Sequence, residues 1–260
     1  MERKIFIFSI VILGMIFGNS SLLLAKEKPK NSAGDTLCPK GSDARGMFHA
    51  DRDGNPLYPD KKIRFKDVGD FHEGAAWVLG KNGRYFFIDS TGKAINKKTY
   101  PQRPISGFVN GFAIVENFSG EYVLFVRKDG TQLPGNFFKV SPFREGLAAV
   151  ENMDGLCFHI DTSGALAYKA KYQDVGDFHC GFAAVMDEKG DCFYIDKNNE
   201  PLRDGDGPTA TVITFSKMPP DFDEQGEVVI ENKKSIIKIT LKKETGEVIF
   251  AITPVVKNKK

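Results

Sequence analysis

The sequence predicts an all-β fold of tandem repeats about 35 residues long, and three observations lead to this prediction. A Phe-x-x-Gly motif begins at Phe71, Phe108, Phe143 and Phe178, at intervals of 37, 35 and 35 residues. A second motif, an apolar segment followed by a turn, comes after each copy of the first. No stretch shows the periodicity of an amphipathic helix. Self-similarity at a fixed period is the signature of a repeat architecture.

The first half of each repeat predicts a strand that is buried on both faces. Ala and Val occupy fixed positions two residues apart, so their side chains point to the same face. These residues are Ala76, Ala113, Ala148 and Ala183, and Val78, Val115, Val150 and Val185. The position between them is also apolar and holds Trp77, Ile114, Ala149 and Ala184. A strand that is apolar on both faces suits a sheet packed between two neighbouring sheets.

The second half of each repeat predicts a strand that ends in a turn. Its four copies cover residues 86–92, 124–130, 158–164 and 193–199, and they are rich in aromatic and β-branched residues. Asp at the first and Gly at the fourth turn position are typical of β-turns. Asn82-Gly83 and its counterparts between the halves predict a hairpin. Further short strands at 65–70 and 172–177 give each repeat three or four strands, close to a propeller blade.

Two imperfect copies flank the four repeats. Residues 48–54 form a second half without a first half, so we assign residues 46–203 to four repeats and an N-terminal half repeat. Residues 204–253, which include Phe222 and Gly226, predict a degenerate fifth repeat or a C-terminal β segment. A propeller-like ring that closes through the half repeat is favoured, because both faces of the first strand are apolar. An open solenoid of β-hairpins with capped ends is the alternative.

The pattern Phe-x-Glu-Gly-x-Ala-x-Val, followed by apolar-Ile-Asp-x-x-Gly, resembles the bacterial WG-containing repeat. Residues 71–95 and 143–166 match this pattern best. The Trp-Gly or Tyr-Gly pair that gives the family its name is absent, and Arg84-Tyr85, Leu156-Cys157 and Asp191-Cys192 stand in its place. The resemblance implies an interaction or binding scaffold without shared catalytic residues.

The first 25 residues have the pattern of a secretory signal peptide. Arg3 and Lys4 precede an apolar run over residues 5–17, and Ala25 precedes a polar segment. The run is shorter than the roughly 20 residues that a membrane-spanning helix needs. We therefore expect a periplasmic or secreted protein with no membrane span after signal removal, and an uncleaved N-terminal anchor is the alternative. Residues 26–45 predict a linker, and residues 254–260 a basic tail.

Composition and motifs exclude several classes of function. The 260 residues are 41% hydrophobic and 27% charged, which predicts a folded core rather than a disordered chain. Lys and Arg number 36 against 34 Asp and Glu, so a net charge of +2 predicts no nucleic-acid partner. The sequence lacks a nucleophile elbow, a P-loop, an HExxH motif and a dinucleotide fingerprint. We therefore expect a non-enzyme without a cofactor.

Trp77, His72 and His179 are the candidate binding residues. Trp77 interrupts a column of small residues and is a candidate contact for sugar or protein, with core packing as the alternative. His72 and His179 share one repeat column, and His49 and His159 share another. Each pair lies more than one repeat apart, whereas zinc needs three or four converging ligands. Packing rather than metal binding is therefore expected for the histidines.

Other polar positions also have two interpretations. Cys157 and Cys192 share a column in successive repeats, so they are a candidate disulfide in an exported protein. Free buried thiols are favoured, because equivalent strands of neighbouring units usually lie too far apart for a disulfide. Asp51-x-Asp53-x-Asn55 begins like a calcium loop, but Pro56 stands where Gly is required, so a turn is expected.

These observations favour an exported, non-enzymatic β-repeat scaffold that mediates protein–protein interaction in the bacterial envelope. Variable loops such as residues 117–119 and 152–153 are the expected contact sites, because loops on a rigid scaffold usually carry specificity. A carbohydrate or cell-wall binding module is the alternative, with a cell-surface glycan as its ligand. An enzyme at the mouth of the ring is a third hypothesis, for which no catalytic constellation is found. The protein is expected to be a monomer.

Overall fold

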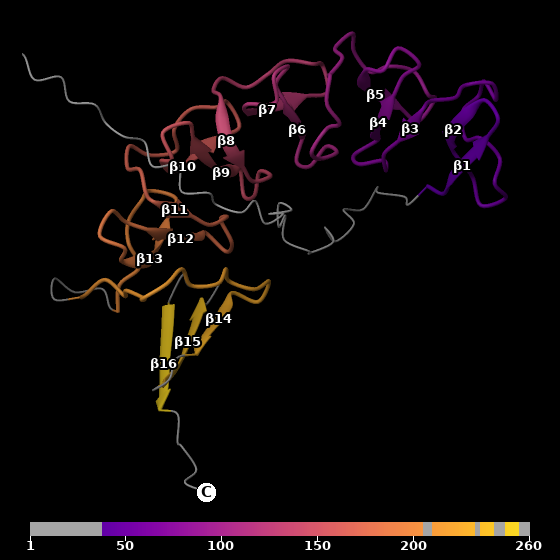
Figure 1. Ribbon diagram of the computed structural model, residues 1–260. Helices are drawn as coiled ribbons and strands as arrows, with labels where there is room; N and C mark the ends of the chain where they lie inside the picture. The colour runs from indigo at the N-terminus through magenta and orange to yellow at the C-terminus, as the bar shows by residue number, and fades with distance from the viewer. Residues whose placement is uncertain (1–37, 205–209, 232–234, 242–247, 255–260) are drawn as a thin grey trace, which may run out of the picture. The chain divides into compact units, whose positions relative to one another are not determined.

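The computed structural model describes residues 38–204, 210–231, 235–241 and 248–254 (Figure 1). These residues form β-strands, turns and irregular segments, and none of them is helical. A helix long and apolar enough to cross a membrane is therefore absent from this part of the chain. The all-β prediction is confirmed. The predicted signal peptide, most of the linker and nearly all of the basic tail lie outside the described residues.

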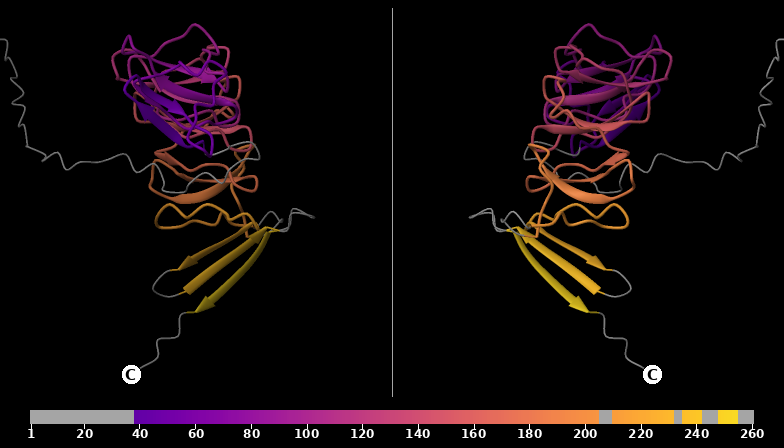
Figure 2. Two further views of the ribbon diagram at one scale, coloured as in Figure 1. Left: turned by 90° about the vertical axis from the view of Figure 1, so that its right-hand side faces the viewer. Right: turned by 90° about the vertical axis from the view of Figure 1, so that its left-hand side faces the viewer.

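The strands form five antiparallel sheets (Figure 1). The first pairs β1 (Lys40–Asp43) with β2 (Gly46–His49), and the second contains β3 (Asp67–Val68), β4 (Ala75–Leu79) and β5 (Tyr85–Asp89). The third contains β6 (Phe112–Glu116), β7 (Val123–Arg127), β8 (Phe137–Val140), β9 (Leu147–Asn152) and β10 (Cys157–Asp161). The fourth contains β11 (Asp174–Val175), β12 (Phe182–Met186) and β13 (Cys192–Asp196). The fifth contains β14 (Glu227–Glu231) and two strands of seven residues, β15 (Ser235–Leu241) and β16 (Val248–Pro254) (Figure 2).

The Phe-x-x-Gly motif forms a two-residue hairpin turn with both central residues in the left-handed region. In the first copy Glu73 has φ 49° and Gly74 has φ 78°. The backbone N–H of His72 donates to the Ala75 carbonyl at 2.9 Å, and the Ala75 N–H donates back at 3.0 Å. The other copies have the same turn, at Asn110-Gly111, Glu145-Gly146 and Cys180-Gly181. The four glycines thus lie in like surroundings, which confirms the predicted repeat.

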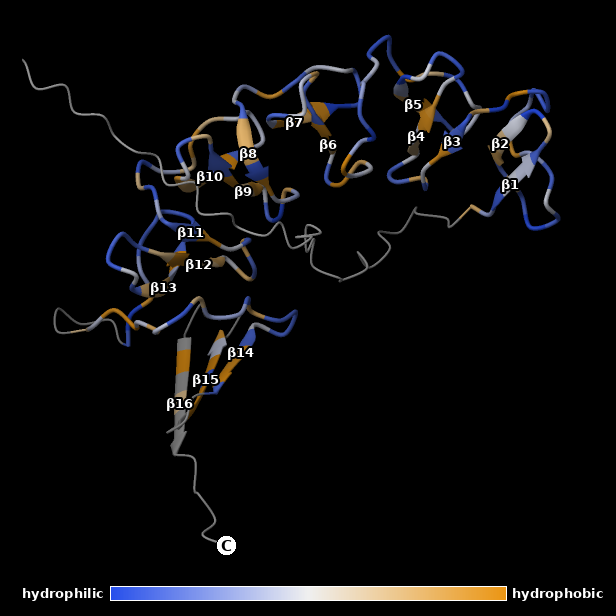
Figure 3. Cartoon of the chain, in the orientation of Figure 1, coloured by the Kyte–Doolittle hydropathy of each residue, from blue (hydrophilic) through white to orange (hydrophobic). Residues whose placement is uncertain are grey.

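The first strand of each hairpin is buried on both faces, as the sequence predicts. In β4, Ala76 and Val78 pack in a cluster with Phe48 of the preceding unit. Ala75 and Trp77 pack in a different cluster with Phe108 of the next unit. The described residues form five such clusters, one between each pair of adjacent units. Figure 3 shows the central strands mostly in orange and the turns mostly in blue.

Aromatic rings join each unit to the next. A ring on the last strand of one hairpin packs against the Phe of the next Phe-x-x-Gly motif. The centroid distances are 4.4 Å for His49–Phe71, 4.7 Å for Phe87–Phe108, 4.8 Å for Phe125–Phe143, 4.6 Å for His159–Phe178 and 4.8 Å for Tyr194–Phe222. The fifth pair joins Phe222 to the fourth repeat by the same kind of contact. Closure into a ring stays a prediction.

A fourth short segment links neighbouring units by hydrogen bonds. In the central sheet this segment is β8, which pairs with β7 of the second repeat and with β9 of the third. Elsewhere it is shorter: Phe65 forms a β-bridge with Met47, and the next residue, Lys66, donates to the Leu79 carbonyl at 2.8 Å. The prediction includes this segment at 65–70 and 172–177 but not at β8. It also missed β1, which lies inside the segment assigned to the linker.

Replacing Gly146 with Ala should lower the free energy of unfolding by about 1–2 kcal/mol, because φ is 85° at this position and an L side chain is strained there. No atom lies within 4 Å of the added Cβ, so the effect is conformational rather than steric. Urea denaturation measures it, and Gly146→Asn is the matched control, since Asn tolerates this region. Equal destabilisation by Ala and Asn would contradict the explanation.

Candidate interaction surface

The buried histidines His49 and His159 are hydrogen-bonded links between units. The Nε2–H of His49 donates to the Gly69 carbonyl at 2.6 Å, and Nδ1 accepts from the Tyr58 hydroxyl at 2.5 Å. His159 has equivalent partners in the Gly176 carbonyl, at 2.8 Å, and the Tyr168 hydroxyl. Both side chains are fully buried. Burial lowers both pKa values, that of His159 to about 4, so the rings are neutral. The packing interpretation is confirmed.

His72 and His179 lie in different repeats and take part in different contacts. His179 Nε2 lies 3.0 Å from Arg144 Nη1 and 3.9 Å from Asp221 Oδ2, and these partners belong to the repeats before and after it. His72 packs against the backbone of Gly107 in the next repeat. Within the described ranges no three His, Cys, Asp or Glu residues are grouped so that they could hold a metal ion.

Trp77 packs inside the protein and is only 6% exposed. Its ring meets Tyr85 edge-on at 5.8 Å, and the guanidinium of Arg103 lies 4.4 Å from the ring centroid. A Cβ on Gly69 would lie 2.3 Å from the indole, so a residue without a side chain is required there. This position agrees with core packing and not with an exposed contact for sugar or protein.

All four cysteines are free thiols. Cys157 and Cys192 are buried, whereas Cys38 and Cys180 are partly exposed. Each of the first two lies at the start of the second hairpin strand of its repeat. The Cys157 thiol donates to the Gln173 carbonyl at 3.4 Å, and the Cys192 thiol lies 3.8 Å from the Gly190 carbonyl. Burial raises the pKa of Cys157 to about 11, which disfavours the reactive thiolate. The candidate disulfide is not formed in the structure.

The Asp51 loop is a turn rather than an open set of ligands. Asp51 Oδ1 accepts from the backbone N–H of Asp53 at 3.0 Å and of Asn55 at 2.8 Å. Asp161 and Asp196 make the same contacts in the third and fourth repeats. These carboxylates stabilise the turns by bonding their own backbone. The turn interpretation is confirmed.

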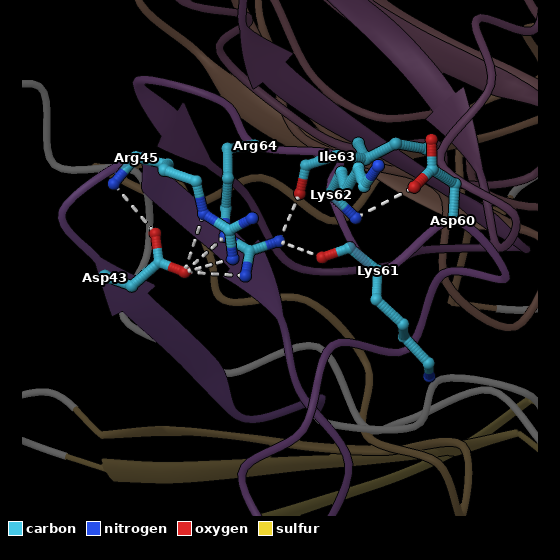
Figure 4. Close-up of polar contacts among 7 residues, drawn as sticks. All are labelled: Asp43, Arg45, Asp60, Lys61, Lys62, Ile63 and Arg64. Atoms are coloured by element: carbon cyan, nitrogen blue, oxygen red, sulfur yellow. Dashed lines mark hydrogen bonds and ion pairs between the residues drawn. The ribbon is translucent and has the colours of Figure 1, made fainter.

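Arg64 contacts the first hydrophobic cluster, since its guanidinium carbon lies 4.2 Å from the centroid of the Phe48 ring. Figure 4 shows its polar contacts. Its side chain is 4% exposed, and Nε and Nη2 donate to Asp43 at 3.1 and 2.7 Å. Nη1 donates to the carbonyls of Lys61 and Ile63. Hydrogen bonds from Arg45, and then from Arg64, hold the Asp43 pKa well below its usual range. Because these contacts use all three guanidinium nitrogens, the group stabilises the fold rather than binding a ligand.

Three exposed apolar side chains, Phe118, Phe138 and Met153, form what we call the apolar rim patch. They are 78%, 62% and 55% exposed. Phe118 lies in the turn between β6 and β7, and Met153 lies in the equivalent turn between β9 and β10. Phe138 belongs to β8, which lies between β7 and β9 in the sheet. The register places Phe137, the residue before Phe138, opposite Val123 and Asn152, which flank the two turns.

A β-bulge accounts for the exposure of Phe138. Phe137 pairs with Asn152, and Lys139 pairs with the adjacent residue Glu151, so Phe138 is one extra residue in β8. Bulges of this kind redirect a side chain and are frequent beside functional sites. The predicted variable loops contain Phe118 and Met153, but the prediction missed Phe138. The sequence feature that could have indicated this exposed residue is Phe138 itself, the second Phe of Phe137-Phe138. At the equivalent position the other repeats have Lys66, Pro101 or Gln173.

Side-chain hydrogen bonds keep the turns of the apolar rim patch in place. Asn117 Oδ1 accepts from the Glu121 N–H at 2.8 Å, and Asn152 Oδ1 accepts from the Leu156 N–H at 2.9 Å. The guanidinium of Arg84, from the same turn of the first repeat, lies 5.8 Å from the Phe118 ring centroid. The patch therefore consists of two exposed apolar groups on ordered turns and one on β8, with the Arg84 cation beside Phe118.

Comparisons with known proteins agree with the repeat. The family model described as the WG containing repeat matches residues 62–85 and 160–189, which confirms the resemblance at these segments. Both contain the sequence Asp-Val-Gly-Asp-Phe-His. No curated protein matches the chain in sequence.

Solved structures similar to this chain include BamB from Moraxella catarrhalis, with 14% identity over 81% of this chain and 73% of that chain, at a TM-score of 0.35. Hsv2 from Kluyveromyces lactis has 10% identity over 71% and 67% of the two chains, at a TM-score of 0.42. The computationally designed Ika8 protein has 12% identity over 84% and 69%, at a TM-score of 0.37.

Acidification should destabilise the protein through His159. An unfolded His has a pKa near 6.5, whereas the folded value is about 4, so the unfolded state binds the proton first as the pH falls. Stability should therefore decrease between pH 6.5 and 4, by about 3 kcal/mol from this group. Urea titrations across this range measure it. His159→Phe, the residue type found at Phe87 and Phe125, should show a flatter profile, and an unchanged slope would contradict the assignment.

Proposed function

We propose that this protein is an exported, non-enzymatic β-repeat scaffold of the bacterial envelope that binds a protein partner through the apolar rim patch. The observation that carries the proposal is the exposure of Phe118 and Met153 on ordered turns of adjacent repeats and of Phe138 on β8 between them. Aromatic residues and Met are enriched in protein interfaces, where they supply most of the binding energy. Clustered exposed apolar side chains commonly mark an interaction site.

The position of the patch supports a specific partner rather than a general property of the repeat. The second position of the equivalent turn holds Lys81, Phe118, Met153 and Glu188 in the four repeats. Only the second and third copies are apolar, and the β-bulge that exposes Phe138 lies between these two. A patch restricted to two neighbouring repeats is suited to one partner at one place.

Export is supported by the N-terminal sequence. Arg3 and Lys4, the apolar run over residues 5–17 and Ala25 have the order of a secretory signal. The carbohydrate-binding alternative predicts exposed aromatic rings at repeat spacing, whereas Trp77 is buried. The protein-binding hypothesis is therefore the one we favour.

A triple variant tests the interaction surface. Phe118→Ser, Phe138→Ser and Met153→Ser together should weaken binding to the partner at least about tenfold, because apolar anchors dominate interface energies. Thermal stability should stay unchanged, because all three side chains are exposed. A photo-crosslinking residue at position 118, used in intact cells, identifies the partner, and calorimetry with the purified pair measures affinity.

The matched control replaces Lys81 and Glu188, the equivalent turn residues of the first and fourth repeats, with Ser. This variant should bind the partner as the wild type does. Loss of binding in the control but not in the triple variant would place the interface elsewhere. Binding of the wild type to an array glycan, without any crosslinked protein, would favour the carbohydrate-binding module.

Removal of the signal peptide should leave a mature chain that begins near Lys26. Expression in a bacterial host, followed by fractionation and intact-mass measurement, determines the N-terminus and the compartment. A chain that retains Met1 and remains with the membrane fraction would support the uncleaved anchor instead.

A further inference from the structure

β16 is the last strand of the fifth sheet and follows the hairpin of β14 and β15, as the fourth segment follows the hairpin in the earlier units. In the earlier units the fourth segment is hydrogen-bonded on both sides. β8 pairs with β7 behind it and with β9 ahead of it, and Phe65-Lys66 bridges two units in the same way. β16 pairs with β15 on one side only, over seven residue pairs from Ser235–Pro254 to Leu241–Val248. In the part of the chain that the structure describes, no strand pairs with its far edge.

This far edge lacks the features that usually protect an edge strand. Charged side chains, prolines and bulges are the common means of preventing edge-to-edge pairing. Residues 248–254 contain no charged residue, and the only proline is the last residue, Pro254. The register with β15 is continuous, without a bulge. β16 thus presents a regular row of backbone groups that another strand can join.

The edge at the other end of the repeat array differs. β1 is the first strand of the N-terminal hairpin, and it also lacks a second neighbour among the described residues. It contains Lys40 and Asp43, and both are exposed. Lys40 is paired with Asp70 at 3.0 Å, and Asp43 with Arg64. β1 therefore has charged protection, which makes it a poor partner for the uncharged β16.

We propose that β16 pairs with β16 of a second copy of this chain, in an antiparallel arrangement about a two-fold axis. Antiparallel pairing is the arrangement of every sheet in this protein. An axis at Ala251 places Phe250 opposite Ile252 and Val248 opposite Pro254, and no like charges meet. Such an interface is isologous, so one strand supplies both halves of it.

The neighbouring side chains are compatible with this dimer. On the outer face, Ile249 is 38% exposed, and Ala251 is also exposed. Lys238 lies beside Ala251 in the register, and its charge is compensated by Glu227 at 2.8 Å. The two three-stranded sheets would form one sheet of six strands. This dimer differs from the monomer expected from the sequence, and it does not depend on the apolar rim patch.

Charge substitutions at the axis test the dimer. Sedimentation equilibrium of the full chain after signal removal should show a monomer–dimer equilibrium over about a hundredfold range of concentration. Ala251→Lys places two lysines opposite each other and should weaken the dimer about fivefold, as should Ala251→Glu. An equimolar mixture of the two variants should restore the dimer, because opposite charges then face each other. This rescue also shows that both variants are folded.

Ser42→Lys, on the exposed edge of β1, is the matched control and should leave the equilibrium unchanged. A wild-type protein that stays monomeric up to about millimolar concentration would overturn the proposal. So would a dimer that Ser42→Lys disrupts and that neither Ala251 variant affects, because the interface would then lie at β1.

Discussion

The stacking of one ring against the Phe of the next repeat is the constraint on which the rest of the structure depends. Sheets of two or three strands are marginally stable alone, so each unit needs apolar surface from its neighbour. Each buried Phe contributes roughly 1.5–3 kcal/mol, and five such contacts at 4.4–4.8 Å join the units in chain order. The opposing ring is Phe, His or Tyr, so the aromatic character of this position is kept in all five pairs. The His and Tyr rings also bond a carbonyl of the following unit, as Tyr194 does with Pro220.

The left-handed turn explains why one position of the motif varies while the repeat persists. The residue before Gly points toward the next unit, so its side chain links repeats. Glu73 accepts from the Gly111 N–H at 3.1 Å, and Glu145 accepts from the Gly181 N–H at 3.0 Å. Asn110, in the repeat between them, donates to the Phe143 carbonyl at 2.8 Å instead. Different side chains reach different acceptors or donors, and each holds the following unit in place.

The sequence predicts those parts of the fold in which several residues repeat one pattern. The two-sided strands and the turn glycines are of this kind, and both are confirmed. The fourth segment is predicted only at 65–70 and 172–177, because elsewhere a single bridge such as Tyr85–Tyr100 is too short to show alternation. β1 has weak strand propensity in Gly41 and Ser42, and the Phe48 ring opposite Gly41 leaves no room for a side chain there. The bulge at Phe138 depends on pairing with two other strands, which local sequence does not encode.

The packing of each repeat against the next also indicates where this scaffold can acquire a specific function. Both faces of the first hairpin strand are buried against neighbours, and the Phe-x-x-Gly turn at its start holds the next unit. The turn at the other end of the strand keeps a glycine with positive φ in every copy. Its second position, in contrast, changes from Lys81 to Phe118, Met153 and Glu188 without loss of the fold. Because side chains of different chemistry occur at this position without loss of the repeat, selection for a partner can act there, and two residues of the apolar rim patch occupy it.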